Sequence, residues 1–180
     1  IVPFYTMKKL LLCLAHPDDE SFAVGGTVAK YVADGWDVEL LCATKGEEEE
    51  VQQKELEQAG KILGISSITF MGYRDGTVKD VPAGELEEAI YQKMMDCVPD
   101  VVITFDTLGL SNHPDHVRMC YSTTYAFQKY AKWIADQLAQ LPDATEETEP
   151  KLYYVCMPER LVEHLKAEKV IPAESFGKPW

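Results

Sequence analysis

Short apolar runs alternate along the chain with longer segments in which apolar residues recur every three or four positions. The apolar runs have the length of buried strands, and they lie at residues 8–15, 37–44, 67–73, 100–106 and 151–158. The other segments have helical spacing, and they lie at 22–34, 48–63, 84–98, from the His-Pro-Asp at 113 to about 138, and at 159–170. This alternation predicts one α/β domain over residues 1–180, a Rossmann-like three-layer sandwich in which helices cover both faces of a mostly parallel sheet.

The apolar positions of each helix predict the face that it turns toward the sheet. They are Phe22, Val28, Ala29, Val32 and Ala33 in the first helix, Val51, Leu56, Ala59 and Leu63 in the second, and Leu86, Ile90, Met94 and Cys97 in the third. We expect Gly35 and Gly64 to end the first two helices and Asp75-Gly76 to form a turn. The acidic, proline-bounded segment 141–150 is expected to be an exposed loop.

Composition narrows the classes of function. The formal net charge of −13 argues against a nucleic-acid partner, because phosphate binding needs clustered lysine and arginine. No apolar run approaches the ~20 residues of a membrane span, and the first seven residues lack the features of a signal peptide. Met7 is a candidate for the natural start. The five cysteines form no CxxC pair, and Cys13 and Cys42 lie inside strand-like runs. We therefore interpret the cysteines as buried thiols in a reducing, cytoplasmic compartment, rather than as disulfides or a zinc knuckle.

A histidine-containing acidic segment follows the first apolar run directly. It runs from His16 to Glu20 as HPDDE, and a second His-Pro-Asp begins at His113 and is followed by His116. Ligands of open α/β sheets bind outside the carboxyl ends of the strands. Because both segments follow predicted strands, we expect them to meet at that edge, which would bring three of the four histidines together.

These side chains suit a metal-dependent hydrolase. Imidazole nitrogens and carboxylate oxygens are ordinary zinc ligands, and a catalytic zinc usually has three protein ligands and a water. His16, one aspartate of the first segment and one histidine of the second would make such a site, and the other aspartate would be free to act as a base. The remaining histidine could polarise a carbonyl or protonate a leaving amine. The alternative is that the same side chains only cap the helices that follow them.

Four short motifs resemble those of the PIG-L/LmbE-like family of zinc-dependent N-acetylglucosaminyl deacetylases. They are AHPDDE, ATKGEEEE, FMGYRDG and HPDH, and the similarity covers residues 8–160. The resemblance implies a hydrolase that uses zinc-activated water to remove the acetyl group from the amide nitrogen of an N-acetylglucosamine-type substrate. It implies zinc as the cofactor, with another divalent ion such as Fe²⁺ as the alternative, and a small N-acetylated sugar as the partner. The oligomeric state stays open, a homo-oligomer included.

Carried over by position, the resemblance assigns roles to individual residues. The metal ligands fall on His16, Asp19 and His116, and the general base falls on Asp18. His113 matches a histidine that stabilises the oxyanion or the departing amine, and Asp115 matches the carboxylate that orients it. The sugar contacts fall on Lys45, Glu47, Arg74 and Asp75. The residues alone leave open which aspartate is the ligand and which is the base.

Three features depart from the family's pattern. Ser111 stands where family enzymes carry a tyrosine that touches the oxyanion, and Asn112 stands where glycine is usual. The chain stops at Trp180, whereas members commonly continue, so it is either a short member or lacks part of the family's domain. Two other functions stay open: an amidase acting on a larger thiol-sugar conjugate, and a non-catalytic α/β binding protein that contains a metal. A flavodoxin-like domain is disfavoured, because the acidic segment after the first strand would repel phosphate.

Overall fold

The computed structural model describes residues 7–140 and 149–180. Its main sheet has the strand order β3-β2-β1-β4-β5, and every neighbouring pair is parallel. The strands are β1 (Lys9–Leu14), β2 (Asp37–Thr44), β3 (Ser67–Tyr73), β4 (Val101–Phe105) and β5 (Lys151–Val155). The predicted α/β fold is confirmed, and β2 and β3 have the predicted bounds. Because the strands share one direction, their carboxyl ends meet at a single edge of the sheet.

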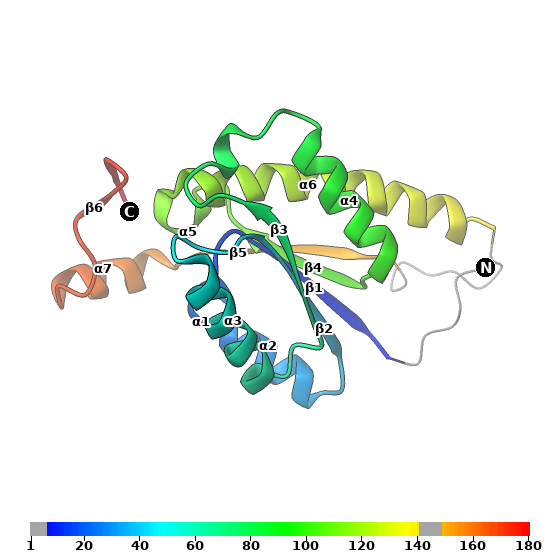
Figure 1. Ribbon diagram of the computed structural model, residues 1–180, viewed down its shortest axis with the longest axis horizontal. Helices are drawn as coiled ribbons and strands as arrows, with labels where there is room; N and C mark the ends of the chain where they lie inside the picture. The colour runs from blue at the N-terminus through cyan, green and yellow to red at the C-terminus, as the bar shows by residue number, and fades with distance from the viewer. Residues whose placement is uncertain (1–6, 141–148) are drawn as a thin grey trace.

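Helices cover both faces of this sheet. On one face lie α1 (Asp19–Phe22), α2 (Gly25–Ala33) and α3 (Glu49–Leu63), and on the other lie α4 (Glu85–Cys97) and α6 (Pro114–Leu138) (Figure 1). The chain continues after β5 into α7 (Glu159–Ala167) and a hairpin of β6 (Glu174–Ser175) and β7 (Lys178–Pro179). Two short turns of helix, η1 (Val78–Asp80) and α5 (Gly109–Asn112), follow β3 and β4. The apolar pattern predicted neither these turns nor the hairpin, because segments so short carry no periodicity.

The core is centred on β1, the middle strand. Leu10 through Leu14 are all buried, as expected for a strand that is covered on both faces. The predicted core face of α4 is confirmed, because Leu86, Ile90 and Met94 are fully buried and Cys97 nearly so. The edge strand β5 is more open, with Tyr153 and Tyr154 exposed.

The predicted helix 22–34 corresponds to α2, whereas Phe22 is the last residue of the separate helix α1, and part of the predicted apolar face is wrong. Phe22 is 85% exposed, and Ala29 and Ala33 are also exposed. The backbone leaves the helical conformation at Val24 (φ −136°, ψ 6°) and a new helix starts at the next residue. The break interrupts the helical phase, so that Val24 and Val28, rather than Phe22, point into the core.

The prediction that Val51 faces the sheet is also wrong, because its side chain is exposed. The helix α3 packs on the sheet through Leu56 and Gly60, and a Cβ added at Gly60 would lie 2.8 Å from Ile68. Leu56 lies five positions after Val51, so the two side chains point about 140° apart around the helix axis. As predicted, Gly35 and Gly64 end the first two long helices with positive φ angles of 83° and 82°.

All five cysteines are free, and Cys13, Cys42, Cys97 and Cys120 are buried as predicted. The prediction is wrong for Cys156, which follows the edge strand β5 and is exposed. Within residues 7–140 and 149–180, no helix combines the length and the apolar character needed to cross a bilayer. Most of the predicted loop 141–150 lies outside the described residues, as do residues 1–6.

Candidate active site

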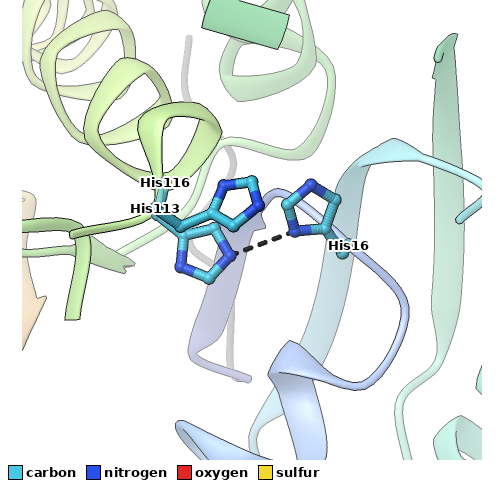
Figure 2. A group of neighbouring side chains, drawn as sticks. All are labelled: His16, His113 and His116. Atoms are coloured by element: carbon cyan, nitrogen blue, oxygen red, sulfur yellow. Dashed lines mark hydrogen bonds between the residues drawn. The ribbon is translucent and has the colours of Figure 1, made fainter. Parts of the chain in front are cut away.

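The polar residues that follow the strands come together at the carboxyl edge of the sheet. His16 and Asp19 follow β1, Asp75 follows β3, and His113 and His116 follow β4 at the start of α6. Figure 2 shows the three imidazole rings side by side, with those of His113 and His116 extending from α6 toward His16. Segments nearly 100 residues apart in sequence therefore meet, as the strand order requires.

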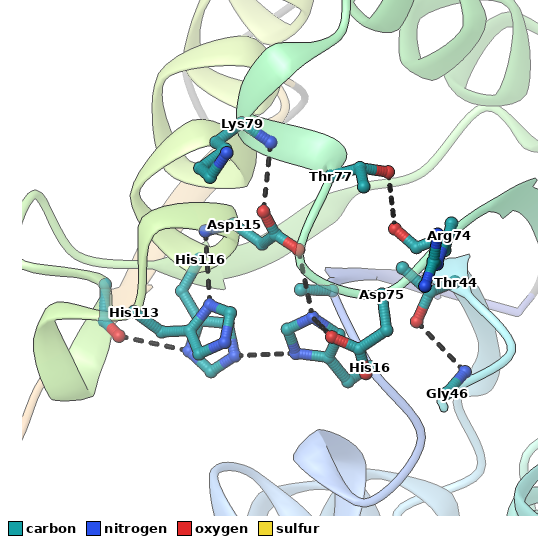
Figure 3. A network of polar contacts seen from close by, with 12 residues as sticks. His16, Thr44, Gly46, Arg74, Asp75, Thr77, Lys79, His113, Asp115 and His116 are labelled. Carbon is teal, nitrogen blue, oxygen red and sulfur yellow. Dashed lines mark hydrogen bonds and ion pairs between the residues drawn. The ribbon is translucent and has the colours of Figure 1, made fainter. Parts of the chain in front are cut away.

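The rings of His16 and His116 face each other through one nitrogen each. The Nδ1 atom of His16 lies 3.0 Å from Nε2 of His116 (Figure 2). The other nitrogen of each ring contacts an acceptor: Nδ1 of His116 lies 3.1 Å from the carbonyl oxygen of Gly109. Nε2 of His16 lies 3.3 Å from carboxylate oxygens of both Asp75 and Asp115 (Figure 3).

These contacts fix the tautomer of each neutral ring. A carbonyl or carboxylate oxygen only accepts, so His116 donates from Nδ1 and His16 donates from Nε2. The two nitrogens that face each other then both carry lone pairs. Two lone pairs at this distance repel each other unless a proton or a metal cation lies between them.

Asp19 completes this arrangement. Asp19 is buried, with 7% of its surface exposed, and Oδ2 accepts backbone hydrogen bonds from His16 (2.7 Å) and Ala15 (3.2 Å). This leaves Oδ1 to face His116, where it lies 3.4 Å from Nε2. Two ligand atoms bound to a tetrahedral zinc at ~2.0–2.1 Å lie about 3.3–3.4 Å apart. Nδ1 of His16 lies 3.0 Å from Nε2 of His116 and 3.9 Å from Oδ2 of Asp19, so ligand atoms of the three residues lie near the separations that a tetrahedral cation needs.

The cluster has perturbed pKa values in the absence of a cation. Burial raises the pKa of Asp19 to about 7, and the backbone hydrogen bonds and charge of His16 only partly oppose this. Burial and the neighbouring charge of His16 lower the pKa of His116 to about 3. Burial alone would lower the pKa of His16, but its hydrogen bond to Asp115 and the charges of Asp19 and Asp75 outweigh burial and raise it. In the metal-free protein, the proton between the two rings therefore belongs to His16.

Two other groupings share His16. One ring nitrogen each of His16, His113 and His116 are close enough together to hold an ion, and so are a ring nitrogen of His16 and carboxylate oxygens of Asp75 and Asp115. The second of these groupings uses Nε2 of His16. Binding there would require His16 to lose the Nε2 proton that the two carboxylates accept. The arrangement with Asp19 and His116 leaves the Nε2 proton of His16 in place, because it uses the Nδ1 atom of that ring.

Asp18 lies beside this cluster on a strained turn. Its φ of 99° is unusual for a residue other than glycine, and strain of this kind is concentrated at functional sites. Its backbone N–H donates to Oε2 of the buried Glu20 (3.0 Å), and its own side chain is exposed. Burial, together with the charge of Glu20, raises the pKa of Asp18. Glu20 thus shapes the loop that presents Asp18, a role that the acidic segment alone did not reveal.

His113 and Asp115 are neighbours but not in the way that the resemblance implies. The backbone N–H of Asp115 donates to Nδ1 of His113 (3.2 Å), so the neutral ring of His113 carries its proton on Nε2. The carboxylate of Asp115 is fully buried and contacts His16 instead, while it accepts the backbone N–H of Lys79 at 3.0 Å (Figure 3). Asp115 therefore orients a metal-ligand candidate rather than the ring of His113.

The four residues assigned to the sugar lie at the same edge but differ in placement. Asp75 is half-buried against His16. Glu47 and Arg74 are exposed and Lys45 is partly buried, and all three follow β2 or β3. Hydrogen bonds between threonine side chains and the backbone hold the loops that carry them. The hydroxyl of Thr44 accepts from the N–H of Gly46 (3.2 Å), and the hydroxyl of Thr77 donates to the carbonyl of Arg74 (2.7 Å) (Figure 3).

Two supports of His116 were not predicted from the sequence. The ring of Phe105, at the end of β4, stacks on the imidazole with centroids 4.1 Å apart. Gly109 supplies the carbonyl that accepts from Nδ1, and its φ is +60°. A Cβ added to Gly109 would lie 2.8 Å from both Cβ of His116 and the backbone nitrogen of Val117. The glycine before the second His-Pro-Asp was the available sequence signal.

Comparisons with known proteins identify the family of this chain. The family model PIG-L, described as GlcNAc-PI de-N-acetylase, matches residues 11–128. A 1D-myo-inositol 2-acetamido-2-deoxy-α-D-glucopyranoside deacetylase from Mycobacteroides abscessus is 34% identical, over 82% of this chain and 64% of its own length. A probable N-acetyl-α-D-glucosaminyl L-malate deacetylase 2 from Bacillus anthracis is 31% identical, over 82% of this chain and 66% of its own length. The chain thus spans just under two thirds of the length of these curated relatives.

Solved structures share the fold. A conserved protein from Thermus thermophilus superposes with a TM-score of 0.63 at 29% identity, over 86% of this chain and 68% of its own. The N,N'-diacetylchitobiose deacetylase from Pyrococcus horikoshii superposes with a TM-score of 0.60 at 26% identity, over 78% of this chain and 54% of its own.

Proposed function

The chain belongs to the PIG-L family of GlcNAc-PI de-N-acetylases, and from this premise we propose that it is a metal-dependent hydrolase of N-acetylglucosamine-type substrates. The reaction is removal of the acetyl group from the amide nitrogen. The observation that carries the proposal is that Nδ1 of His16 and Nε2 of His116 face each other, each with a lone pair, beside the carboxylate of Asp19. This arrangement has a clear use if a divalent cation binds there.

His16, Asp19 and His116 would hold the metal, for which we propose zinc, with Fe²⁺ as the alternative. When bound, such an ion lowers the pKa of a water ligand to roughly 7 and polarises the acyl oxygen of the substrate. Two nitrogen ligands and one carboxylate are a common set for catalytic zinc. They do not exclude iron, because cellular availability also decides which ion is bound.

Asp18 would act as the general base. Its side chain is exposed beside the cluster, and its raised pKa brings proton uptake closer to neutral pH. His113 would donate a hydrogen bond from Nε2–H to the oxygen of the tetrahedral intermediate, since its Nδ1 is occupied by a backbone N–H. The proton taken up by Asp18 would then pass to the departing amine. Asp115 would keep the lone pair of His16 directed at the metal.

The substrate class that we propose comes from the family. The relatives are named for sugars linked to inositol or to malate, and one structural neighbour is named for chitobiose. The side chains that would contact the sugar follow β2 and β3 at the same edge of the sheet: Lys45, Glu47, Arg74 and Asp75. The five free cysteines support a reducing, cytoplasmic location.

Acetate release tests this function. The protein loaded with zinc is offered N-acetylglucosamine, N,N'-diacetylchitobiose, and the inositol-linked and malate-linked forms. We expect acetate from at least one, abolished by a chelator and restored by added metal. The control variant Asp80→Asn, which alters an exposed carboxylate on η1, should retain full turnover. No acetate from any of these compounds, with one equivalent of zinc bound, would refute the proposed substrate class.

A further inference from the structure

The C-terminal hairpin returns to the active site. The carbonyl of Pro179 in β7 accepts a hydrogen bond from Nδ2 of the buried Asn112 (3.1 Å). The ring of Phe176, between β6 and β7, meets the ring of His113 edge-on, with centroids 4.5 Å apart. Two adjacent residues of the site loop, Asn112 and His113, therefore contact two points of a hairpin that lies more than sixty residues further along the chain.

Phe176 occupies a position that its residue type does not suit. It and Gly177 form the two-residue turn of the hairpin, with φ angles of 50° and 70°. Turns with two positive φ angles favour Asn, Asp or Gly at the first position, not a bulky aromatic residue. The side chain is also 58% exposed, so burial in the core does not explain it. Neither the turn nor the core therefore accounts for a phenylalanine here.

We propose that Phe176 is the aromatic wall of the sugar subsite, and that Asn112 fixes it there by binding the hairpin. The ligand is a pyranose ring, whose faces carry C–H groups that pack on aromatic side chains, as is common in the walls of small-molecule sites. This inference rests on the proposed function. It adds a substrate-binding residue from a segment that contributes neither a metal ligand nor a base.

The position of His113 explains why the sugar would meet Phe176. The ring of His113 contacts those of His16, His116 and Phe176, with centroid distances of 4.7, 4.7 and 4.5 Å. It therefore lies between the proposed metal ligands and the hairpin. A hydrogen bond from Nε2 of His113 to the acyl group would place the attached sugar within one ring width of this imidazole. The exposed ring of Phe176, which contacts this imidazole, would then lie within reach of the sugar.

The test separates loss of the ring from loss of the fold. Phe176→Asn removes the ring and gives the turn the favoured Asn-Gly sequence, so the hairpin should persist. Phe176→Tyr keeps a ring. Asn112→Gly removes the amide but tolerates the positive φ of 61° at this position. Tyr125→Ala removes an aromatic side chain of similar exposure (63%) from α6, about 13 Å along the helix from His116.

The readouts are KM and kcat for the best substrate of the acetate assay, and the zinc dissociation constant. We expect Phe176→Asn to raise KM about five- to tenfold, with kcat within about twofold and zinc affinity unchanged. Asn112→Gly should raise KM in the same direction, Phe176→Tyr should restore most of the affinity lost in Phe176→Asn, and Tyr125→Ala should resemble the wild type. An unchanged KM in Phe176→Asn, or a fall in kcat and zinc affinity without a change in KM, would overturn the inference and leave the proposed function standing. A wild-type enzyme that releases no acetate would instead overturn the proposed function, and this inference with it.

Discussion

Replacing Asp115 by asparagine would test whether a buried carboxylate sets the tautomer of His16. Oδ1 of Asp115 accepts the backbone N–H of Lys79, and Oδ2 faces Nε2 of His16. In Asp115→Asn the remaining oxygen stays with the Lys79 N–H, because that donor has to be satisfied in a buried position. The new amide then donates toward His16. His16 responds by moving its proton to Nδ1, the nitrogen that faces His116 and the proposed metal.

The expected magnitude follows from this change of tautomer. A cation can bind Nδ1 only after that proton leaves or the amide turns away. Changes to groups behind metal ligands typically cost 10–100-fold in affinity, or about 1.4–2.7 kcal/mol. We expect the lower part of this range, because Asp75 also lies 3.3 Å from Nε2 of His16 and can accept in place of Asp115. The double variant Asp75→Asn, Asp115→Asn should reach the upper part.

Zinc affinity is measured by competition with a chromophoric chelator, with turnover expressed per bound zinc. Asp80→Asn serves as the matched control, since it neutralises an exposed carboxylate of η1. Wild-type zinc affinity in both the single and the double variant would refute the tautomer argument. If zinc affinity fell in the single variant Asp75→Asn but stayed at the wild-type value in Asp115→Asn, Asp75 would be the carboxylate that sets the tautomer of His16.

Three further predictions test other parts of the site. Asparagine tolerates the positive φ of Asp18, so Asp18→Asn should keep zinc bound. Its kcat should fall by roughly 10²–10⁴-fold in the acetate assay, and undiminished turnover would exclude Asp18 as the base. Zinc affinity should fall as the pH is lowered through about 7, because protons then compete with the metal for Asp19 and His16. The pKa of Asp19 is raised to about 7, and that of His16 is also raised. A pH-independent affinity in chelator titrations would contradict this ligand set. Gly109→Ala should lower the free energy of unfolding by about 1–3 kcal/mol in denaturant titrations, because the new Cβ would clash with His116 and the φ of this position is +60°. The control Gly26→Ala, whose Cβ would have no atom within 4 Å, should not lower it. Equal stabilities of the two variants would refute the steric argument.

Much of the fold was predictable because its signals are local. The strand runs are short, apolar and well separated, so β2 and β3 were predicted to the residue and the others to within a few residues. The core face of α4 followed from its spacing alone. The prediction failed where the local pattern was ambiguous: the break at Val24 shifted the helical phase, and the exposed Val51 lies in the first turn of α3, away from the residues that pack on the sheet.

The location of the site was also predictable, because a parallel sheet gathers the carboxyl ends of its strands. That rule places His16, Asp19, His113 and His116 at one edge without coordinates. It could not tell which carboxylate contacts which imidazole. Asp115 faces His16 and not His113, because the turn at the start of α6 gives His113 the backbone N–H of Asp115.

By itself, the sequence determined the layer architecture, the edge that carries the site and the residue types available for chemistry, since each depends on periodicity or on position after a strand. Only the tertiary structure decided the tautomers of the two facing histidines, the loop-shaping role of Glu20, and the return of Phe176 to His113. These features depend on contacts of about 3–5 Å between segments that are distant along the chain, or on backbone strain at single residues. A pattern of hydrophobic and polar positions carries neither kind of information, because it records what each segment buries and not which atom of a side chain faces which partner.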